Sequence, residues 1–104
     1  MSKHRAQEEI IAEMLSIVLK KAKKTHIMYR ANLSYTLLCK YLDLLIGNQL
    51  IKYNEGDKTY EVTTKGETYL DRYAEYKTIE TTLISRELEY DDKKASLFQL
   101  LEED

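Results

Sequence analysis

The chain has 104 residues, of which 33% are charged, and its formal net charge is −2. This length fits one domain with its own core, and no run approaches the ~20 apolar residues of a membrane-spanning helix, so we expect a cytoplasmic protein. The only cysteine is Cys39, and His4 and His26 lack further ligands at zinc spacing, so no internal disulfide, metal or cofactor is expected.

The charges are divided unequally along the chain. Residues 1–65 contain 11 Lys and Arg against 7 Asp and Glu, a balance of +4, whereas residues 66–104 contain 5 against 11, a balance of −6. A cationic surface attracts polyanions, so the first part is a candidate for binding nucleic acid. A run of lysines more often serves only to solubilise a helix end, so nucleic-acid binding has to be supported by other features of the sequence.

The first predicted element is an amphipathic helix over about residues 5–22. Its apolar residues recur at spacings of three and four, with acids early and lysines late. After it, residues 25–29 have a β-leaning composition that could begin as a short strand, and residues 29–33 have room for one or two helical turns.

A second strong helical pattern runs from Ser34, a candidate N-cap, to Ile46, and Gly47 and Asn48 are expected to end it with a residue of positive φ. Two short strands follow at residues 50–54 and 59–63, joined by a charged turn. This pattern predicts a β-hairpin.

The last predicted helix begins near Thr64, which lies three residues before Glu67 in the capping-box arrangement. It continues past residue 90. Asp91 or Asp92 offers a cap for a separate short helix near residues 91–93, but no glycine or proline prevents one continuous helix, so both alternatives are open.

The order of elements predicts a mainly α fold with a small β-hairpin, the winged helix-turn-helix. In this fold a short helix and a tight turn lead into a longer helix that enters the major groove, and the hairpin forms a wing beside it. We therefore expect a DNA-binding domain at residues 1–66, with a recognition helix at 34–46 and a wing at 50–63, followed by a long C-terminal helix at 67–104.

The stretch Ile27-Met28-Tyr29-Arg30-Ala31-Asn32-Leu33-Ser34-Tyr35 resembles a string that precedes the recognition helix in the small archaeal winged-helix DNA-binding proteins of about ten kilodaltons. That family includes Sulfolobus chromatin-associated proteins and predicted winged-helix transcriptional regulators. Residues 60–67 also look like the family's second wing strand and the start of its last helix. The resemblance covers roughly residues 8–75 and implies a DNA-binding function.

The resemblance also implies a homodimer joined by an antiparallel coiled coil of the long last helices. The interface residues expected on this basis are Tyr69, Tyr73, Tyr76, Ile79 and Leu83. Carboxylates at Glu80 and Glu87 interrupt the apolar repeat, so a shifted register or a shorter seam is equally allowed. The alternative is a monomer whose last helix folds back on the first.

The expected DNA contacts are polar or cationic residues that the core does not require: Lys24, Arg30, Asn32, Ser34, Tyr35, Thr36, Lys40, Lys52, Lys58 and Lys65. Lys40 is the only cation on the recognition helix, and the Arg, Asn or Gln that usually read base edges are missing from its outer face. We therefore expect contacts mainly to phosphates and low sequence specificity. For Asn32, a structural role in the turn is at least as favoured.

No glycine-rich phosphate loop, nucleophile elbow or triad spacing is present, which argues against an enzyme. The competing hypothesis is a winged-helix module for protein–protein interaction without DNA binding, because the sequence pI is about 5.7. The partners expected on the favoured reading are double-stranded DNA and a second copy of the chain, and the sequence identifies no small-molecule ligand. A transcriptional regulator and a nucleoid-associated protein are not distinguished.

Overall fold

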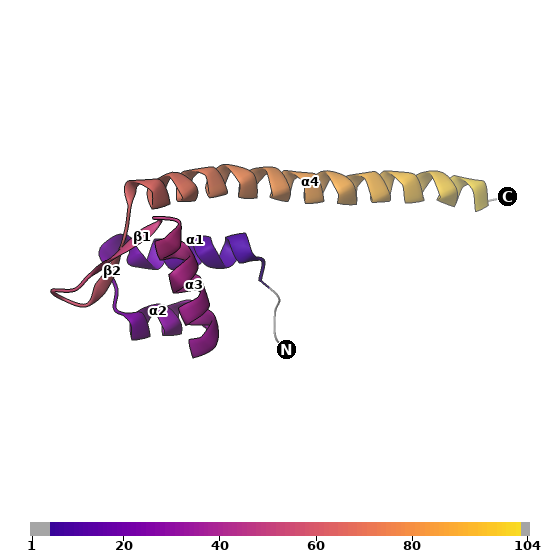
Figure 1. Ribbon diagram of the computed structural model, residues 1–104. Helices are drawn as coiled ribbons and strands as arrows, with labels where there is room; N and C mark the ends of the chain where they lie inside the picture. Colours follow the sequence, from indigo (N-terminus) through magenta and orange to yellow (C-terminus); the bar gives the residue numbers. More distant parts are fainter. Residues whose placement is uncertain (1–4, 103–104) are drawn as a thin grey trace. The chain divides into compact units, whose positions relative to one another are not determined.

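The computed structural model describes residues 5–102, and the expectation for His4 lies outside them. The elements follow in the order α1 (Gln7–Ile17), a 3-10 turn η1 (Val18–Lys20), α2 (Lys24–Arg30), α3 (Tyr35–Gly47), β1 (Ile51–Asn54), β2 (Thr59–Val62) and α4 (Thr64–Glu102) (Figure 1). The chain divides into two compact units, residues 1–73 and 74–104. The fold is mainly α with one hairpin, as predicted.

The core of the first unit is formed by α1, α2, α3 and the hairpin. Its most deeply buried side chains come from separate elements: Met14, Leu15, Val18, Ile27, Leu38 and Leu45. None of the buried residues is polar or charged among those described. Burial of apolar side chains is therefore what holds the three helices and the wing together.

The first helix is shorter than predicted. Helix α1 ends at Ile17, and the chain continues as the 3-10 turn and then as Lys21, whose φ of 56° is left-handed. This change of direction brings Ala22 beside Tyr60, and the two residues exchange backbone hydrogen bonds of 3.1 and 2.8 Å. Strand-like pairing thus occurs at Ala22, just before the segment predicted to form a strand.

The predicted strand at residues 25–29 was wrong, because these residues lie in helix α2. Ile27 is completely buried, and helical geometry places it on the same side as Ala31, which is also completely buried. Tertiary burial here outweighs the β-leaning local composition.

Helix α3 begins where the sequence predicted. Ser34 is its N-cap, and the Ser34 hydroxyl accepts a hydrogen bond of 3.2 Å from the Leu37 amide. Its C-terminus differs from expectation, because Gly47 and Asn48 keep negative φ and Gln49 takes the left-handed conformation with φ 57°. The Asn48 side chain instead donates to the Leu44 carbonyl at 2.8 Å.

The wing is a two-stranded antiparallel hairpin in which Tyr53 lies opposite Tyr60. Their rings are 4.9 Å apart between centroids. At the tip, the Asp57 carboxylate accepts a hydrogen bond of 2.7 Å from the Thr59 hydroxyl, and Lys58 is left-handed with φ 59°. The hairpin at residues 50–63 was predicted correctly.

The capping box at Thr64 and Glu67 was wrong by one residue. Thr63 precedes the helix, and its hydroxyl accepts a hydrogen bond of 3.0 Å from the Gly66 amide while it donates to the Gln49 carbonyl at 2.7 Å. Helix α4 then runs to Glu102 without interruption at residues 91–93, so the alternative of a separate terminal helix does not hold.

The second unit, described from Ala74 to Glu102, consists of helix alone. Its large apolar side chains are exposed, among them Ile79, Leu83, Leu88, Leu97 and Phe98. Within the described range, no helix combines the length and the apolarity that crossing a membrane requires.

Candidate nucleic-acid interface

Helices α2 and α3 form the helix-turn-helix of the first unit. Asn32 lies in the turn with a left-handed φ of 53°, a conformation that asparagine tolerates better than most residues. Its backbone carbonyl accepts a hydrogen bond of 3.1 Å from Arg5. Asn32 therefore has a structural role in shaping the turn, and the residue is exposed to solvent.

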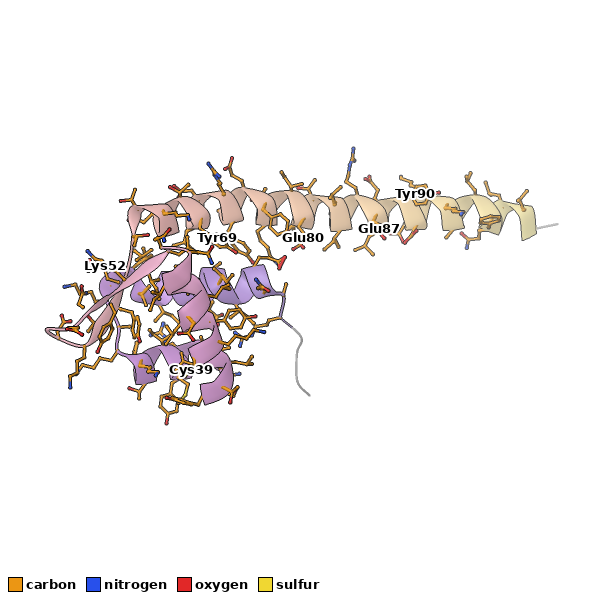
Figure 2. The ribbon with its side chains drawn as sticks, in the orientation of Figure 1. Cys39, Lys52, Tyr69, Glu80, Glu87 and Tyr90 are labelled. Carbon is orange, nitrogen blue, oxygen red and sulfur yellow. The ribbon has the colours of Figure 1, made fainter. Side chains whose placement is uncertain are left out.

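The outer face of α3 carries several of the predicted contact residues. Thr36 and Lys40 are exposed, and they lie four residues apart on one side of the helix. Cys39 is half-buried on the same helix (Figure 2). Ser34 is exposed, but its hydroxyl is already engaged in capping, so it is less available to DNA than expected.

Lys24 and Tyr35 are in contact, one at the start of α2 and the other at the start of α3. The Lys24 ammonium lies 3.3 Å from the Tyr35 hydroxyl and 5.0 Å from the centroid of the Tyr35 ring. The hydrogen bond to Tyr35 raises the pKa of Lys24 above its ordinary value, so the side chain stays cationic. Two predicted residues from separate helices are thus brought together.

The C-terminal end of α2 exposes Tyr29 and Arg30. Tyr29 is 78% exposed, which is more than the exposed tyrosines Tyr35 and Tyr53 of the same unit. Tyr29 is not among the contact residues predicted from the sequence. The signal for it was the spacing of Ile27 and Ala31, which directs those residues to the core and leaves Tyr29 on the outer side.

The predicted phosphate-binding lysines on the wing and at the start of α4 are exposed, but their contacts within the protein differ. Lys52, on β1 (Figure 2), lies 3.9 Å from the Glu61 carboxylate across the hairpin. Lys58 lies in the turn between β1 and β2. Lys65, on the first turn of α4, donates a hydrogen bond of 2.8 Å to the Asn48 carbonyl. Lys65 therefore helps to join α4 to the end of α3, and its ammonium is only partly available to a ligand.

The residues expected at a dimer interface fall in both units. Tyr69 is half-buried against the core of the first unit, where its hydroxyl donates to the Glu8 carbonyl at 3.2 Å and its ring stacks on that of Tyr73 at 6.5 Å. In the second unit, Tyr76, Ile79 and Leu83 are exposed. Tyr69 and Tyr73 thus already have contacts within a single chain.

Charged side chains on α4 are partly paired along the helix. Glu80 accepts hydrogen bonds from Lys77 at 3.0 Å and from Tyr76 at 3.3 Å, and the contact with Lys77 lowers the pKa of Glu80. Arg86 pairs with Glu89 at 3.0 Å. Glu87 and Tyr90, labelled in Figure 2, are also exposed on this helix.

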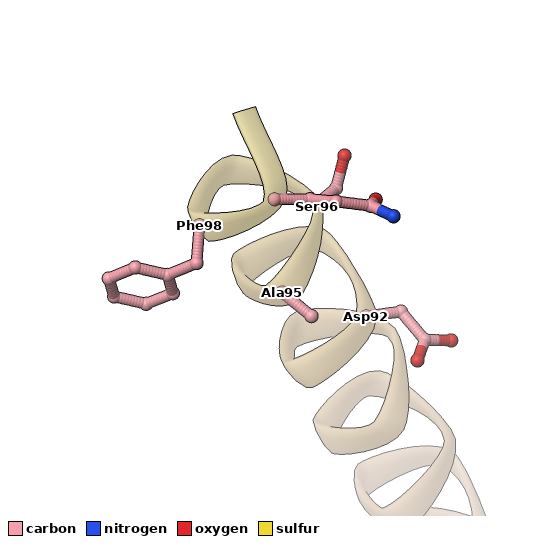
Figure 3. Close-up of a pocket in the computed structure, with 5 residues that line it drawn as sticks. Asp92, Ala95, Ser96 and Phe98 are labelled. Carbon is pink, nitrogen blue, oxygen red and sulfur yellow. The ribbon is translucent and has the colours of Figure 1, made fainter. Parts of the chain in front are cut away.

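The residues described in the structure include no group of three or more His, Cys, Asp and Glu able to hold a metal ion. A shallow depression near the C-terminal end of α4 is lined by Asp92, Ala95, Ser96 and Phe98, all from that helix. Figure 3 shows Phe98 pointing away from the side on which Ser96 lies. This depression is helix surface and does not enclose a ligand.

These features define a winged helix-turn-helix protein with a long C-terminal helix. A model of the winged helix-turn-helix family matches residues 4–81, and the chain belongs to this family. A solved structure of Sso10a-2, a DNA-binding protein from Sulfolobus solfataricus, is similar with a TM-score of 0.68 and 29% identity, over 96% of this chain and 100% of that one. This similarity confirms the resemblance to small archaeal winged-helix DNA-binding proteins.

The protein MJ0287 of Methanocaldococcus jannaschii is 43% identical over 63 residues, and MJ0290 of the same organism is 40% identical over 67 residues. The matches span 60% and 64% of this chain but only 63% and 31% of those relatives. Lactococcus lactis ZitR shares the fold with a TM-score of 0.58 at 18% identity, over 99% of this chain and 79% of that one. This chain thus spans less than two thirds of the length of either Methanocaldococcus relative.

Proposed function

We propose that the protein binds duplex DNA as a homodimer, mainly through phosphates, with α3 and the wing as the contacting elements. The observation that carries this proposal is the exposed outer face of α3, which does not take part in the core. Cations lie on α2, on α3 itself and on the wing: Lys24, Arg30, Lys40, Lys52 and Lys58. Cations placed in this way suit a phosphate backbone. The DNA-binding description of Sso10a-2, which is similar over nearly the whole chain, supports the same function.

The proposed division of labour assigns DNA binding to residues 1–66 and dimerisation to residues 67–104. The exposed apolar side chains of the second unit support the second assignment, because Ile79 and Leu83 are 62% and 64% exposed in the single chain. A second copy of the helix would remove such side chains from water. The role would be that of a transcriptional regulator or of a nucleoid-associated protein in the cytoplasm, without enzymatic activity.

Base readout contributes little in this proposal. The outer face of α3 presents Thr36, Lys40 and Asp43, and Asp43 bears the wrong charge for a phosphate. A single lysine on this face gives no bidentate pattern. We therefore expect affinity to depend weakly on sequence and strongly on salt.

Substitution of the cations tests this proposal. Lys40→Ala and Arg30→Ala should each weaken binding about threefold on all duplexes alike and reduce the salt slope by about 1.8, because each removes one phosphate contact of about 0.9 from both protomers of the dimer. Fluorescence anisotropy with several labelled duplexes measures both quantities. Lys93→Ala, an exposed lysine of the second unit, is the matched control and should change neither. A loss confined to one duplex sequence would contradict the low-specificity claim.

A second function remains in competition, because the second unit presents an acidic and apolar helix. In that case the winged domain would bind an acidic protein surface and α4 would supply most of the contact area. This alternative predicts no affinity for duplex DNA even at low salt, which the same titration of the unmodified protein measures.

A further inference from the structure

The contact between Lys24 and Tyr35 joins the two helices of the helix-turn-helix on their solvent side. The ammonium group has both the hydroxyl at 3.3 Å and the ring face at 5.0 Å as partners. A tyrosine offers a cation a hydrogen-bond acceptor and the negative face of its ring without neutralising the charge. Lys24 is therefore held in place and remains a full cation.

Helix stability does not account for a lysine at this position. Lys24 lies in the first turn of α2, where the helix dipole disfavours a positive charge. Within residues 5–102, no carboxylate lies within ion-pairing distance of the Lys24 ammonium. The charge is thus both placed at some cost and left without an anion in the protein.

The surroundings of Lys24 extend from α3 to the wing. Besides the hydrogen bond to Tyr35, the side chains of Tyr35 and Cys39 on α3 and of Tyr60 on β2 act electrostatically on the ammonium group, and each of these effects raises the pKa of Lys24. Lys24 therefore sits where the start of the recognition helix approaches the wing. In a helix-turn-helix the second helix lies in the major groove and the first helix crosses the DNA backbone, so a cation at the start of α2 is placed to reach a phosphate.

We propose that Tyr35 is a positioning residue that holds Lys24 at the site where Lys24 binds a DNA phosphate. The inference rests on the proposed function and assigns a role within the same surface. A free lysine loses much side-chain freedom when it binds a phosphate, and a lysine already held by Tyr35 loses less. Tyr35 thus increases affinity through Lys24, whereas Lys24 supplies the electrostatic contact.

Two other roles for Tyr35 make different predictions. If Tyr35 touched DNA by itself, its removal would weaken binding whether or not Lys24 is present. If Tyr35 served only the fold, its removal would lower stability, but the side chain is 62% exposed and lies outside the core. Coupling between the two residues therefore separates positioning from both alternatives.

The test is a double-mutant cycle on DNA affinity with Lys24→Ala, Tyr35→Ala and the double variant, titrated against a random-sequence duplex at several salt concentrations. Tyr35→Ala should weaken binding about fivefold in the unmodified background and less than about twofold in the Lys24→Ala background. Lys24→Ala should reduce the salt slope by about 1.8, about 0.9 for each protomer of the dimer, while Tyr35→Ala should leave the slope nearly unchanged, because the phosphate contact itself persists.

Tyr35→Phe separates the hydroxyl from the ring. It should weaken binding about twofold, because the cation–ring contact remains. It should also lower the pKa of Lys24 towards its ordinary value, which NMR titration of the lysine side chain measures without DNA. Circular dichroism of each variant confirms that the fold is retained.

Tyr29→Ala is the matched control, because Tyr29 is also an exposed tyrosine on the helix-turn-helix, at 78%. Its effect should add to that of Lys24→Ala. Equal losses from Tyr35→Ala in both backgrounds would overturn the positioning role while leaving DNA binding intact. An unchanged Lys24 pKa in Tyr35→Phe would overturn the part assigned to the Tyr35 hydroxyl in holding Lys24. Absence of any binding by the unmodified protein would overturn the proposed function, and the inference with it.

Discussion

Gly66 marks a close approach of two backbone segments in the first unit. A Cβ atom at this position would collide with the Leu50 carbonyl oxygen and with the Val62 side chain. The carbonyl belongs to the backbone and already accepts a hydrogen bond of 3.0 Å from the Thr63 amide, so it is not free to move. The start of α4 is therefore pressed against the wing at a site that only glycine fits.

Gly66→Ala should lower the free energy of unfolding by about 2 kcal/mol, because the added methyl group overpacks the junction. Urea denaturation followed by circular dichroism measures the change. Gly47→Ala provides the comparison, since no atom lies within 4 Å of its Cβ position and its φ is negative. It should be neutral or stabilise by about 0.5 kcal/mol. Equal effects at both positions would contradict the close approach.

Two adjacent threonines have different roles at the start of α4. The Thr63 hydroxyl caps the helix and bonds to the Gln49 carbonyl, whereas Thr64 is exposed. Thr63→Ala should therefore cost about 1.5 kcal/mol of stability and Thr64→Ala less than about 0.5 kcal/mol, which thermal or urea unfolding measures. A larger loss of stability in Thr64→Ala than in Thr63→Ala would contradict this assignment and favour Thr64 as the capping residue, as the sequence pattern predicted.

The sequence predicted residue roles unevenly, and the reason is tertiary. The Thr64–Glu67 spacing matched a capping box, but the capping residue is Thr63, one residue earlier, whose hydroxyl also bonds to the chain after α3. The contact between Lys24 and Tyr35 joins residues 11 positions apart, and no local pattern encodes it. Side-chain roles that depend on a neighbouring element are not accessible from local spacing.

At the scale of elements, α3 is the helix that its sequence determines most completely. Ser34 caps it, and Leu38, Leu42 and Leu45 form a buried stripe at helical spacing. Local and tertiary preferences agree there, which explains why its start and the hairpin after it were predicted correctly. Helix α2 is the opposite case, because seven residues are too few for a helix to be stable without packing.

The N-cap of α3 gives a prediction at this scale. Ser34→Ala should lower the stability of the first unit by about 1 kcal/mol, since the Leu37 amide loses its acceptor. Ser34→Asp should retain stability, because a carboxylate also caps a helix. It should nevertheless weaken DNA binding through repulsion of phosphate, and unfolding and anisotropy measured on the same samples separate the two effects. Equal stability of Ser34→Ala and the unmodified protein would contradict the capping role.

At the scale of the whole molecule, the two units pose different physical problems. The first has a continuous apolar core, whereas the second exposes Leu83, Leu97 and other apolar side chains along a single helix. A helix of this kind requires a partner to bury them, and we propose that a second copy of the chain is that partner. Two linked winged domains would then bind one duplex more tightly than either alone.

Leu83→Glu tests the proposed dimer. The substitution places a charge among the exposed apolar side chains of α4 and should raise the dimer dissociation constant about 100-fold, as measured by analytical ultracentrifugation. Apparent DNA affinity should fall with it. Ser85→Glu adds the same charge about 200° around the helix and should leave the dimer intact. A monomeric unmodified protein, or equal effects of the two substitutions, would contradict the dimer.

The measurement that tests the central claim most directly is a titration of labelled random-sequence duplex with the protein, followed by fluorescence anisotropy from low to physiological salt. We predict binding that weakens linearly on a log–log plot against salt, with only a few-fold difference among duplex sequences. No binding at low salt would contradict the account and favour a protein partner for the winged domain.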